Sequence, residues 1–405
     1  MLGCRNGTAF YDVTDSANIF ECDFIPGSNN NWREMKVFSH YAYIVSELTG
    51  SGLLIVDLNY LPDSVHVIRT FTYSGYNRTH SIQQDGPYLY LNGGNVTSGM
   101  SDPGGVRIID LTSNPENPTV RGGWGNEYVH DSRVRNDTMY ACNIYDPPGT
   151  VSVINVANKD NPTTITSWVN NPNPFPHNCA LMPGRTFILT TDETSSPNGK
   201  LKVWNISNLS NVTLVTTWMP TNITTAIVHN VEIYGNYALI AHYSAGVRVV
   251  NISNPASPTE VAWYDTYPTN NSANYSGCWG VFMLPSGKII ASDRQTGLYV
   301  LRSTVPLVGI EDPNSVPKDF ILKQNYPNPF NPSTTIEFSI PKSSYVTLKI
   351  FDALGRQVAQ LIDEYKQAGS YSRTFDASRL ASGVYYYRLS TDNGFSETKK
   401  MILTK

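Results

Sequence analysis

A unit of about fifty residues recurs through the first three quarters of the chain, and this repeat limits the possible folds more than any other feature. Two copies align clearly: HSIQQDGPYLYLNGG with GGVRIIDLTSNPENPTVRGGW from His80, and HNVEIYGNYALIAHYSAGVRVVNISNPASPTEVAWY from His229. Each copy reads as strand, Gly-containing turn, strand, loop, apolar strand, Asn/Pro turn and final strand. The copies start 48, 50, 47, 52 and 50 residues apart, at Trp32, His80, His130, His177, His229 and Trp279.

A four-stranded sheet cannot bury both faces alone, so successive copies must stack on one another. The repeat therefore predicts an all-β chain built as a β-propeller; a parallel β-helix ranks second, because its period would be about twenty residues. The segment from Gly7 to Ile25 reads as the third and fourth strands of one more blade, and MLGC as a remnant of its second. We expect seven blades with the first incomplete; in the alternative, a six-bladed ring, Gly7 to Ile25 completes the last blade.

Composition excludes several classes of protein. The net charge is −4, and no Lys/Arg cluster lies among aromatic residues, so a nucleic-acid partner is not expected. The sequence has no apolar run of membrane-spanning length and no signal peptide after Met1. The five cysteines lack the spacing of zinc-binding motifs, and one disulfide, Cys142 with Cys179, stays open.

The repeat ends after Leu301, and a different domain follows. Residues 305–324 include three prolines and have the composition of an exposed linker. In residues 325–405, segments such as TTIEFSI, YVTLKIF and GVYYYRL alternate with strand periodicity, which predicts a small C-terminal β-sandwich. The predicted organisation is thus a propeller over residues 1–304, a linker over 305–324 and a sandwich over 325–405.

The C-terminal domain carries several short motifs in a fixed order. These are a PNPF box, LKIFDALG, LASGVY and a lysine-containing end, and they include Pro327, Asn328, Pro329, Phe330, Gly355, Gly383, Lys399 and Lys400. With these motifs the domain resembles the type A C-terminal sorting domain that the type IX secretion system of Bacteroidetes-like bacteria reads. The resemblance implies that the type IX machinery is a partner, through residues 325–405. It also implies a protein that is secreted, or held at the outer-membrane surface, in a Gram-negative bacterium.

The repeats carry a second resemblance. The phrases GLLIVDL, GVRIIDL and GVRVVNISNPASP are similar to those of the LVIVD-repeat propellers in bacterial choice-of-anchor B proteins. This implies a surface-exposed propeller but no particular activity. Type IX cargo carries a signal peptide and the family's first blade begins farther upstream, so we expect this sequence to be truncated at its N-terminus.

The repeat also predicts a candidate site. The first strand of each blade lines the central channel, so the histidines that begin these strands should surround one opening: His80, His130, His177 and His229. The loop between the second and third strands opens on the same side and adds Glu47, Asp192, Glu193, His242 and Asp293. Histidines backed by carboxylates suit zinc, copper or iron, and such a metal could support hydrolysis or oxidation. In the alternative reading the histidines are structural, duplicated with the blades, and bond to the neighbouring blade.

The residues after the histidines, the absent catalytic motifs and the charge distribution together limit the possible functions. Ser81, Asp131, Asn178 and Asn230 follow the histidines and should form hydrogen bonds between blades rather than take part in catalysis. The motifs GxSxG, HExxH, GxGxxG and a Walker loop are all missing, so no enzyme class is indicated. Residues 319–405 hold 11 Lys/Arg and 8 Asp/Glu, which leaves 18 and 25 in the preceding residues and favours a neutral or cationic partner for the propeller. We expect an exported propeller that binds a protein, glycan or small molecule; the alternative is a metal-dependent extracellular enzyme.

Overall fold

β-sheets are the only regular structure in the described part of the chain, which confirms the all-β prediction. The computed structural model describes residues 1–76, 78–94, 104–145, 147–195, 199–223, 225–269, 272–305, 307, 319–325, 327–366 and 369–404. The chain divides into two units, Met1–Ile310 and Glu311–Lys405. Most of the predicted linker, 305–324, lies outside the described residues.

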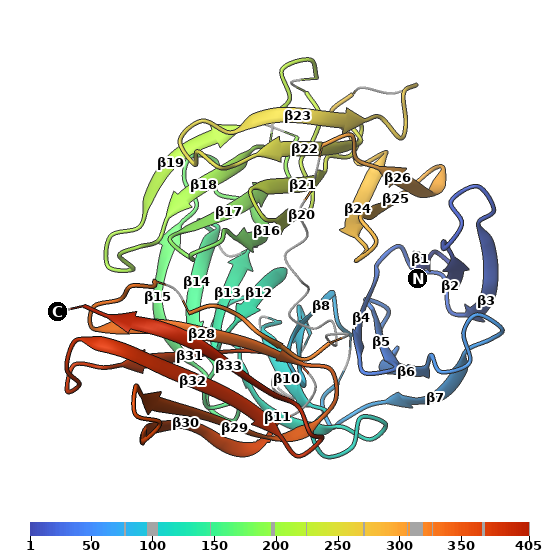
Figure 1. Ribbon diagram of the computed structural model, residues 1–405. Helices are drawn as coiled ribbons and strands as arrows, with labels where there is room; N and C mark the ends of the chain where they lie inside the picture. The colour runs from blue at the N-terminus through green and yellow to red at the C-terminus, as the bar shows by residue number, and fades with distance from the viewer. Residues whose placement is uncertain are drawn as a thin grey trace. The chain divides into compact units, whose positions relative to one another are not determined.

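The first unit is a β-propeller of antiparallel meander sheets (Figure 1). Its first sheet has three strands: β1 (Leu2–Cys4), β2 (Gly7–Asp12) and β3 (Phe20–Pro26). Five four-stranded sheets follow: β4 (Arg33–Phe38), β5 (Tyr41–Ser46), β6 (Leu53–Asp57) and β7 (His66–Phe71); β8 (Ser81–Asp85), β9 (Tyr88–Asn92), β10 (Val106–Asp110) and β11 (Thr119–Trp124); β12 (Asp131–Arg135), β13 (Thr138–Asn143), β14 (Thr150–Asn155) and β15 (Thr163–Val169); β16 (Pro176–Leu181), β17 (Phe187–Asp192), β18 (Leu201–Asn205) and β19 (Thr213–Trp218); β20 (Val231–Tyr234), β21 (Tyr237–Ala241), β22 (Val247–Asn251) and β23 (Thr259–Tyr264). The last sheet has three: β24 (Cys278–Met283), β25 (Lys288–Asp293) and β26 (Gly297–Arg302).

Stacking of neighbouring sheets builds the propeller core. Tyr43 and Ile55 of one sheet pack with Leu89 and Ile109 of the next, and similar apolar clusters join the sheets that follow. Successive first strands contact one another from β4 through β24, so these strands line the centre of the unit (Figure 1). The described residues of this unit form seven sheets, and the blade count of the complete ring stays a prediction.

In most sheets of the propeller, a β-bulge lies where the last strand pairs with the strand before it. In six sheets the register shifts by one residue where the last strand pairs with the strand before it, as between Ile55 and Val56 and between Val249 and Val250. Such a bulge bends the strand and increases its twist. The last strands therefore curve along the outer edge of the propeller, and the first strands stay close together at its centre.

The second unit is a β-sandwich. One sheet contains β27 (Ile321–Leu322), β28 (Ser333–Ile340) and β31 (Gly369–Asp376), and the other contains β30 (Gln357–Lys366), β29 (Ser344–Asp352), β32 (Gly383–Thr391) and β33 (Ser396–Leu403). Alternate residues of these strands face one apolar core, which includes Ile336, Phe338, Leu348, Ile350 and Tyr387.

The PNPF box is joined to the final strand of this sandwich. Phe330 is buried, its N–H donates to the carbonyl of Ile402 at 2.9 Å, and its own carbonyl accepts from Thr404 at 3.0 Å. The side-chain oxygen of Asn328 accepts from the N–H of Ile402 at 2.8 Å. The first and last motifs of the predicted sorting domain are thus parts of one structural element.

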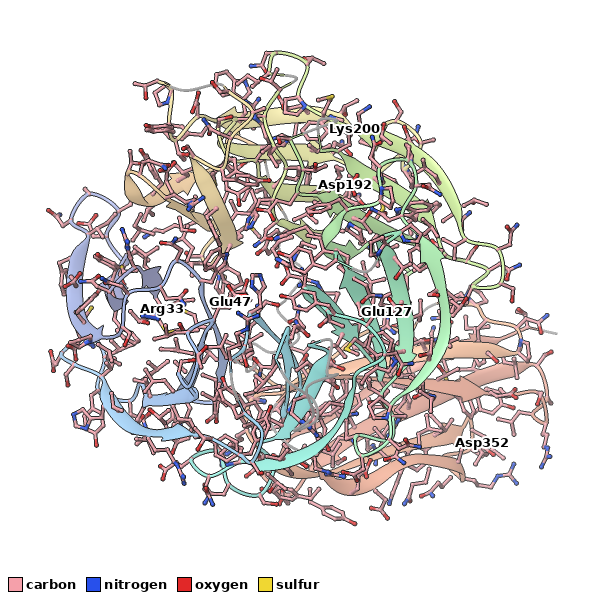
Figure 2. All side chains as sticks on the ribbon, turned by 180° about the vertical axis from the view of Figure 1, so that it is seen from behind. Arg33, Glu47, Glu127, Asp192, Lys200 and Asp352 are labelled. Atoms are coloured by element: carbon pink, nitrogen blue, oxygen red, sulfur yellow. The ribbon has the colours of Figure 1, made fainter. Side chains whose placement is uncertain are left out.

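The other motif residues occupy turns and strands. Gly355 has a φ of 78°, which L residues adopt with strain, in the turn where Arg356 pairs with Asp352 at 2.7 Å (Figure 2). Gly383 begins β32, and Lys399 and Lys400 lie on β33, where Lys399 pairs with Glu397 at 3.1 Å.

Two further sequence-level expectations concern the chain as a whole. Within the described residues no helix has the length and apolarity needed to cross a bilayer. All five cysteines have free thiols, so the Cys142–Cys179 disulfide considered from the sequence is not formed here, although both side chains are buried.

Candidate functional site

Six aromatic side chains, one from the start of each first strand between β4 and β24, close a ring around the channel. The centroid distances are 6.4 Å for Trp32–His80, 3.9 Å for His80–His130, 4.2 Å for His130–His177, 4.3 Å for His177–His229, 4.8 Å for His229–Trp279 and 6.4 Å for Trp279–Trp32. Four of the histidines named from the sequence therefore meet, because each holds the same position in its copy of the repeat.

Two of the predicted carboxylates contact this ring. Glu47 lies 3.2 Å from Nδ1 of His80 and faces the inside of the circle of sheets (Figure 2). The two oxygens of Glu193 lie 3.5 Å from Nε2 of His177 and 3.7 Å from Nε2 of His229. The hydroxyl of Tyr243 donates a hydrogen bond to Glu193 and fixes the orientation of this carboxylate.

The imidazoles differ in how readily they carry a proton. Burial lowers the pKa of His229 to about 3 and that of His177 to about 4. The pKa of His130 also falls well below its ordinary value, because burial and the nearby His80 both oppose its charging. Burial lowers the pKa of His80 too, but the hydrogen bond to Glu47 and the charges of Asp131 and Glu47 outweigh it and leave that pKa raised. Three neutral imidazoles thus lie beside one that accepts a proton more easily.

The ring residues leave little empty space between them. A cavity of about 10 Å³ remains, lined by Trp32, Arg33, Glu34, His80, His130, Asp131, His177, His229, Asn230 and Trp279. This is roughly the room that one water molecule needs. Burial and the charge of Asp131 raise the pKa of Glu34 to about 7. An organic ligand cannot enter this cavity, so a larger ligand would have to bind above the ring.

Exposed aromatic side chains border the ring, and one of them, Trp32, is itself a ring member. We call Tyr145, Tyr275 and Trp32 the aromatic rim; they are 62%, 44% and 38% exposed. Tyr145 packs against Tyr128 at 4.9 Å, and Tyr275 packs against Tyr243 at 5.5 Å. These contacts join the rim to the ring, because Tyr128 lies 6.4 Å from His130 and Tyr243 lies 4.9 Å from His229.

Charged groups accompany the rim. The guanidinium of Arg294 lies over the Trp279 ring at 5.0 Å, and Arg78 is exposed close enough to Tyr145 and Glu47 to act on them electrostatically. Sequence reasoning missed these residues. Tyr145 and Tyr243 lie between the second and third strands of their own sheets, on loops equivalent to those that supplied Glu47 and Glu193. Their position in the repeat was therefore a signal that could have identified them.

Three of the nine predicted site residues have their contacts elsewhere than in the ring, and a site shared by all nine stays a prediction. Among the described residues neither nitrogen of His242 has a hydrogen-bond partner, and its ring packs 6.3 Å from Trp218. Asp192 forms a buried ion pair with Lys202 at 2.8 Å. Asp293 accepts hydrogen bonds from Thr266 at 2.6 Å and from the backbone of its own turn.

Four polar residues that follow the histidines were predicted to bridge neighbouring sheets, and three of them do so. The hydroxyl of Ser81 donates to the carbonyl of His130 at 2.7 Å, and the Asn178 side chain donates to Asp131 at 2.9 Å. Among the described residues the side-chain oxygen of Asn230 has no hydrogen-bond partner. Asp131 and Asn230 also line the cavity.

Comparison with protein families identifies two segments. Residues 324–404 match the secretion system C-terminal sorting domain, and residues 227–266, which contain β20 to β23, match the LVIVD repeat. The chain therefore carries a type IX sorting domain and an LVIVD repeat, as their resemblances predicted, and type IX secretion exports it to the cell surface or the extracellular space. The grouping with choice-of-anchor B proteins stays a prediction. No curated protein matches the sequence.

Solved structures share the architecture at low sequence identity. A functionally unknown protein from Desulfotomaculum acetoxidans is 12% identical with a TM-score of 0.55, over 76% of this chain and 93% of that one. The periplasmic gluconolactonase PpgL of Pseudomonas aeruginosa is 11% identical with a TM-score of 0.54, over 93% and 96%. PorZ, a surface component of the type IX secretion system of Porphyromonas gingivalis, is 12% identical with a TM-score of 0.46; the match covers 92% of this chain but only 51% of PorZ. The two matches with TM-scores above 0.5 concern the fold alone, and the match to PorZ supports no conclusion about this chain.

Proposed function

We propose that this protein is an exported binding module whose propeller recognises a neutral glycan at the aromatic rim. The observation that carries the proposal is the exposure of Tyr145, Tyr275 and Trp32 beside a ring whose central cavity is only about 10 Å³. Each of these side chains packs against an aromatic neighbour on one side and leaves part of its apolar surface exposed to solvent. A ligand that stacks on them binds at the protein surface. Export would bring this surface into contact with ligands outside the cell.

The charges around the rim favour an uncharged, polyhydroxylated ligand. Glu47 and Glu193 supply acceptors, and Arg78 and Arg294 supply donors, so both kinds of hydrogen bond are offered within one small area. A polyanion would meet the two carboxylates, and a polycation would meet the two guanidinium groups. A ligand site typically combines aromatic surface with a few polar groups that fix orientation, and this rim has both.

The test is affinity gel electrophoresis of the full chain through neutral polysaccharides: dextran, xylan, mannan and a mixed-linkage β-glucan. We expect at least one polymer to retard the protein, and the double variant Tyr145→Ala/Tyr275→Ala to lose at least tenfold in affinity. A matched control is Tyr60→Ala/Tyr365→Ala, which removes tyrosines that are 48% and 62% exposed but lie outside the rim. Retardation by none of the polymers, or equal loss in both double variants, would contradict the proposal.

A further inference from the structure

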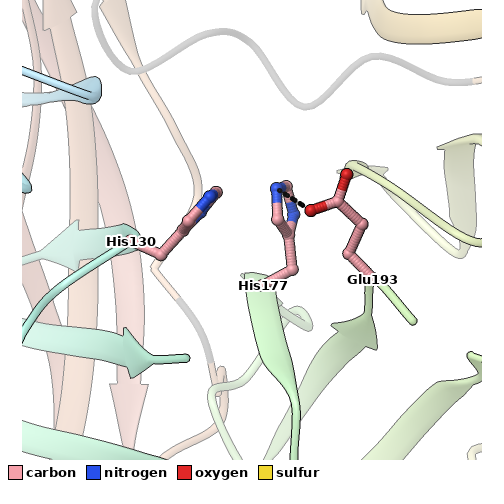
Figure 3. A group of neighbouring side chains, drawn as sticks. All are labelled: His130, His177 and Glu193. Atoms are coloured by element: carbon pink, nitrogen blue, oxygen red, sulfur yellow. Dashed lines mark ion pairs between the residues drawn. The ribbon is translucent and has the colours of Figure 1, made fainter. Parts of the chain in front are cut away.

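Glu193 lies between His177 and His229, with its two oxygens 3.5 Å and 3.7 Å from their Nε2 atoms. One ligand atom each from His130, His177 and Glu193 lies within 4.8 Å of the others (Figure 3). His130 and His177 are 5% and 2% exposed, whereas the Glu193 side chain is 16% exposed and borders the mouth. The cluster is thus formed by buried nitrogens with one carboxylate on the side from which an ion would enter.

The hydrogen bonding of His229 makes this arrangement unfavourable without a cation. Nδ1 of His229 contacts the carbonyl oxygen of Trp279, and a carbonyl can only accept, so Nδ1 carries the hydrogen. In the neutral imidazole Nε2 then presents its lone pair, and it lies 3.7 Å from a carboxylate oxygen of Glu193. Two acceptors that face each other repel unless a hydrogen-bond donor or a cation lies between them, and a metal ion bound by both atoms would remove this repulsion.

The donor set and its spacing fit zinc. Imidazole nitrogens with one carboxylate are a ligand set that Zn²⁺ uses, with bonds of about 2.0–2.2 Å, so ligand atoms in a tetrahedral site are about 3.3 Å apart. The distance of 3.5 Å between Nε2 of His177 and a carboxylate oxygen of Glu193 is already close to this spacing. Small side-chain rotations would bring the remaining atoms from 4.8 Å to the same spacing.

We propose that His130, His177 and Glu193 bind one Zn²⁺ ion at the base of the aromatic rim, with Nε2 of His229 completing the site. Tyr243 holds the carboxylate in place through its hydrogen bond. His80 is not a ligand, because Glu47 already engages it at 3.2 Å. The site goes beyond the proposed function, since it does not depend on which ligand the rim recognises.

The experiment uses the full chain purified without chelators. Elemental analysis gives its metal content, and Co²⁺ titration of the stripped protein, followed by visible absorption and by competition with Zn²⁺, gives affinity and coordination. We expect one equivalent of metal per chain and the absorption of a four-coordinate Co²⁺ site. Glu193→Gln keeps the shape of the side chain and should weaken Zn²⁺ binding more than tenfold, and Tyr243→Phe should weaken it about 10–100-fold as a positioning residue.

The control is His40→Ala, which removes an exposed histidine beside a carboxylate, 3.9 Å from Asp57, at a distance from the ring. Unchanged Zn²⁺ binding in this variant supports the channel site. Less than one equivalent in the wild-type chain after Zn²⁺ addition would overturn the proposal. The proposal would also be overturned if the Glu193→Gln variant bound Zn²⁺ as tightly as the wild type, or if the His40→Ala variant lost the metal. Tryptophan fluorescence of each variant checks that the propeller is folded, because all seven tryptophans lie between Trp32 and Trp279.

Discussion

The propeller and the C-terminal sandwich bury different kinds of side chain. In the described residues, the buried polar side chains of the sandwich are neutral, whereas the propeller buries ionisable groups: His130, Asp131, Lys159, His177, Asp192, Lys202, His229, His242, Arg248 and Asp293. Burial of a charge or of an ionisable group reduces stability unless partners compensate for it. The sandwich therefore avoids the free-energy cost of buried ionisable groups, whereas the propeller interior contains groups that can bind protons or ligands.

The largest expected effect comes from breaking the buried ion pair of the propeller. In Lys202→Met, Asp192 loses its 2.8 Å partner, and the free energy of unfolding should fall by about 3–5 kcal/mol. Burial raises the pKa of Asp192 to about 7 although Lys202 opposes this, so protonation would relieve part of the loss. Urea unfolding followed by tryptophan fluorescence measures the change.

The matched variant is Lys202→Met/Asp192→Leu, which replaces both charges by apolar side chains. It should recover most of the lost stability, because replacement of a buried pair by apolar residues is often close to neutral. If the double variant is as unstable as Lys202→Met, the ion pair does not explain the effect.

A cavity in the sandwich should affect that unit alone. Leu348 lies in its core, and Leu348→Ala should lower the stability of the sandwich by about 2–5 kcal/mol. Hydrogen exchange of the β29 and β32 amides, read by mass spectrometry, should become faster, while the tryptophan transition of the propeller stays where it is. An equal shift of the tryptophan transition would mean that the two units do not unfold separately.

The pH dependence of stability should also differ between the units. Burial and the charge of Arg248 lower the pKa of His242 to about 3 from 6.5, so between these values the unfolded chain binds more protons and stability is lost as the pH falls. This amounts to about 1.4 kcal/mol per pH unit for one full proton. His242→Leu should reduce the proton uptake on unfolding by about one between pH 6 and 4, as measured by urea unfolding at several pH values. An unchanged slope would exclude His242 as its source.

The smallest effect is expected at a surface ion pair of the sandwich. Lys399 and Glu397 are 31% and 35% exposed, and Lys399→Met should change the stability of that unit by less than about 1 kcal/mol. Hydrogen exchange of the β33 amides provides the measurement. A loss comparable to that of Leu348→Ala would show that surface charge, and not the apolar core, stabilises the sandwich.

The sequence predicted the meeting of four histidines because each begins the same strand of its repeat. It could not predict the 3.9–4.3 Å packing of their rings, which depends on how closely the first strands approach at the centre. Asp192 and Glu193 show a second limit. Neighbouring side chains at a strand end point in opposite directions, so only Glu193 reaches the histidines and Asp192 turns to Lys202 on the next strand.

The sorting domain was easier to predict than the propeller site, since its motifs are contiguous and are joined within one sandwich. The PNPF box and the final strand, for example, are bonded through Phe330 and Ile402. The aromatic rim, by contrast, is assembled from loops that differ between the repeats. Tyr145 follows the second strand of its sheet, whereas Tyr275 lies between β23 and β24, so the two tyrosines share no position in the repeat.

Anomalous X-ray diffraction from crystals of the full chain, grown with one equivalent of Zn²⁺ and measured on both sides of the zinc absorption edge, would locate the metal ion. We expect one strong peak per chain, within about 2.2 Å of ligand atoms of His130, His177 and Glu193, inside a closed ring of aromatic side chains. A peak only at surface residues such as His40 and Asp57, or imidazoles that point away from one another, would contradict this expectation.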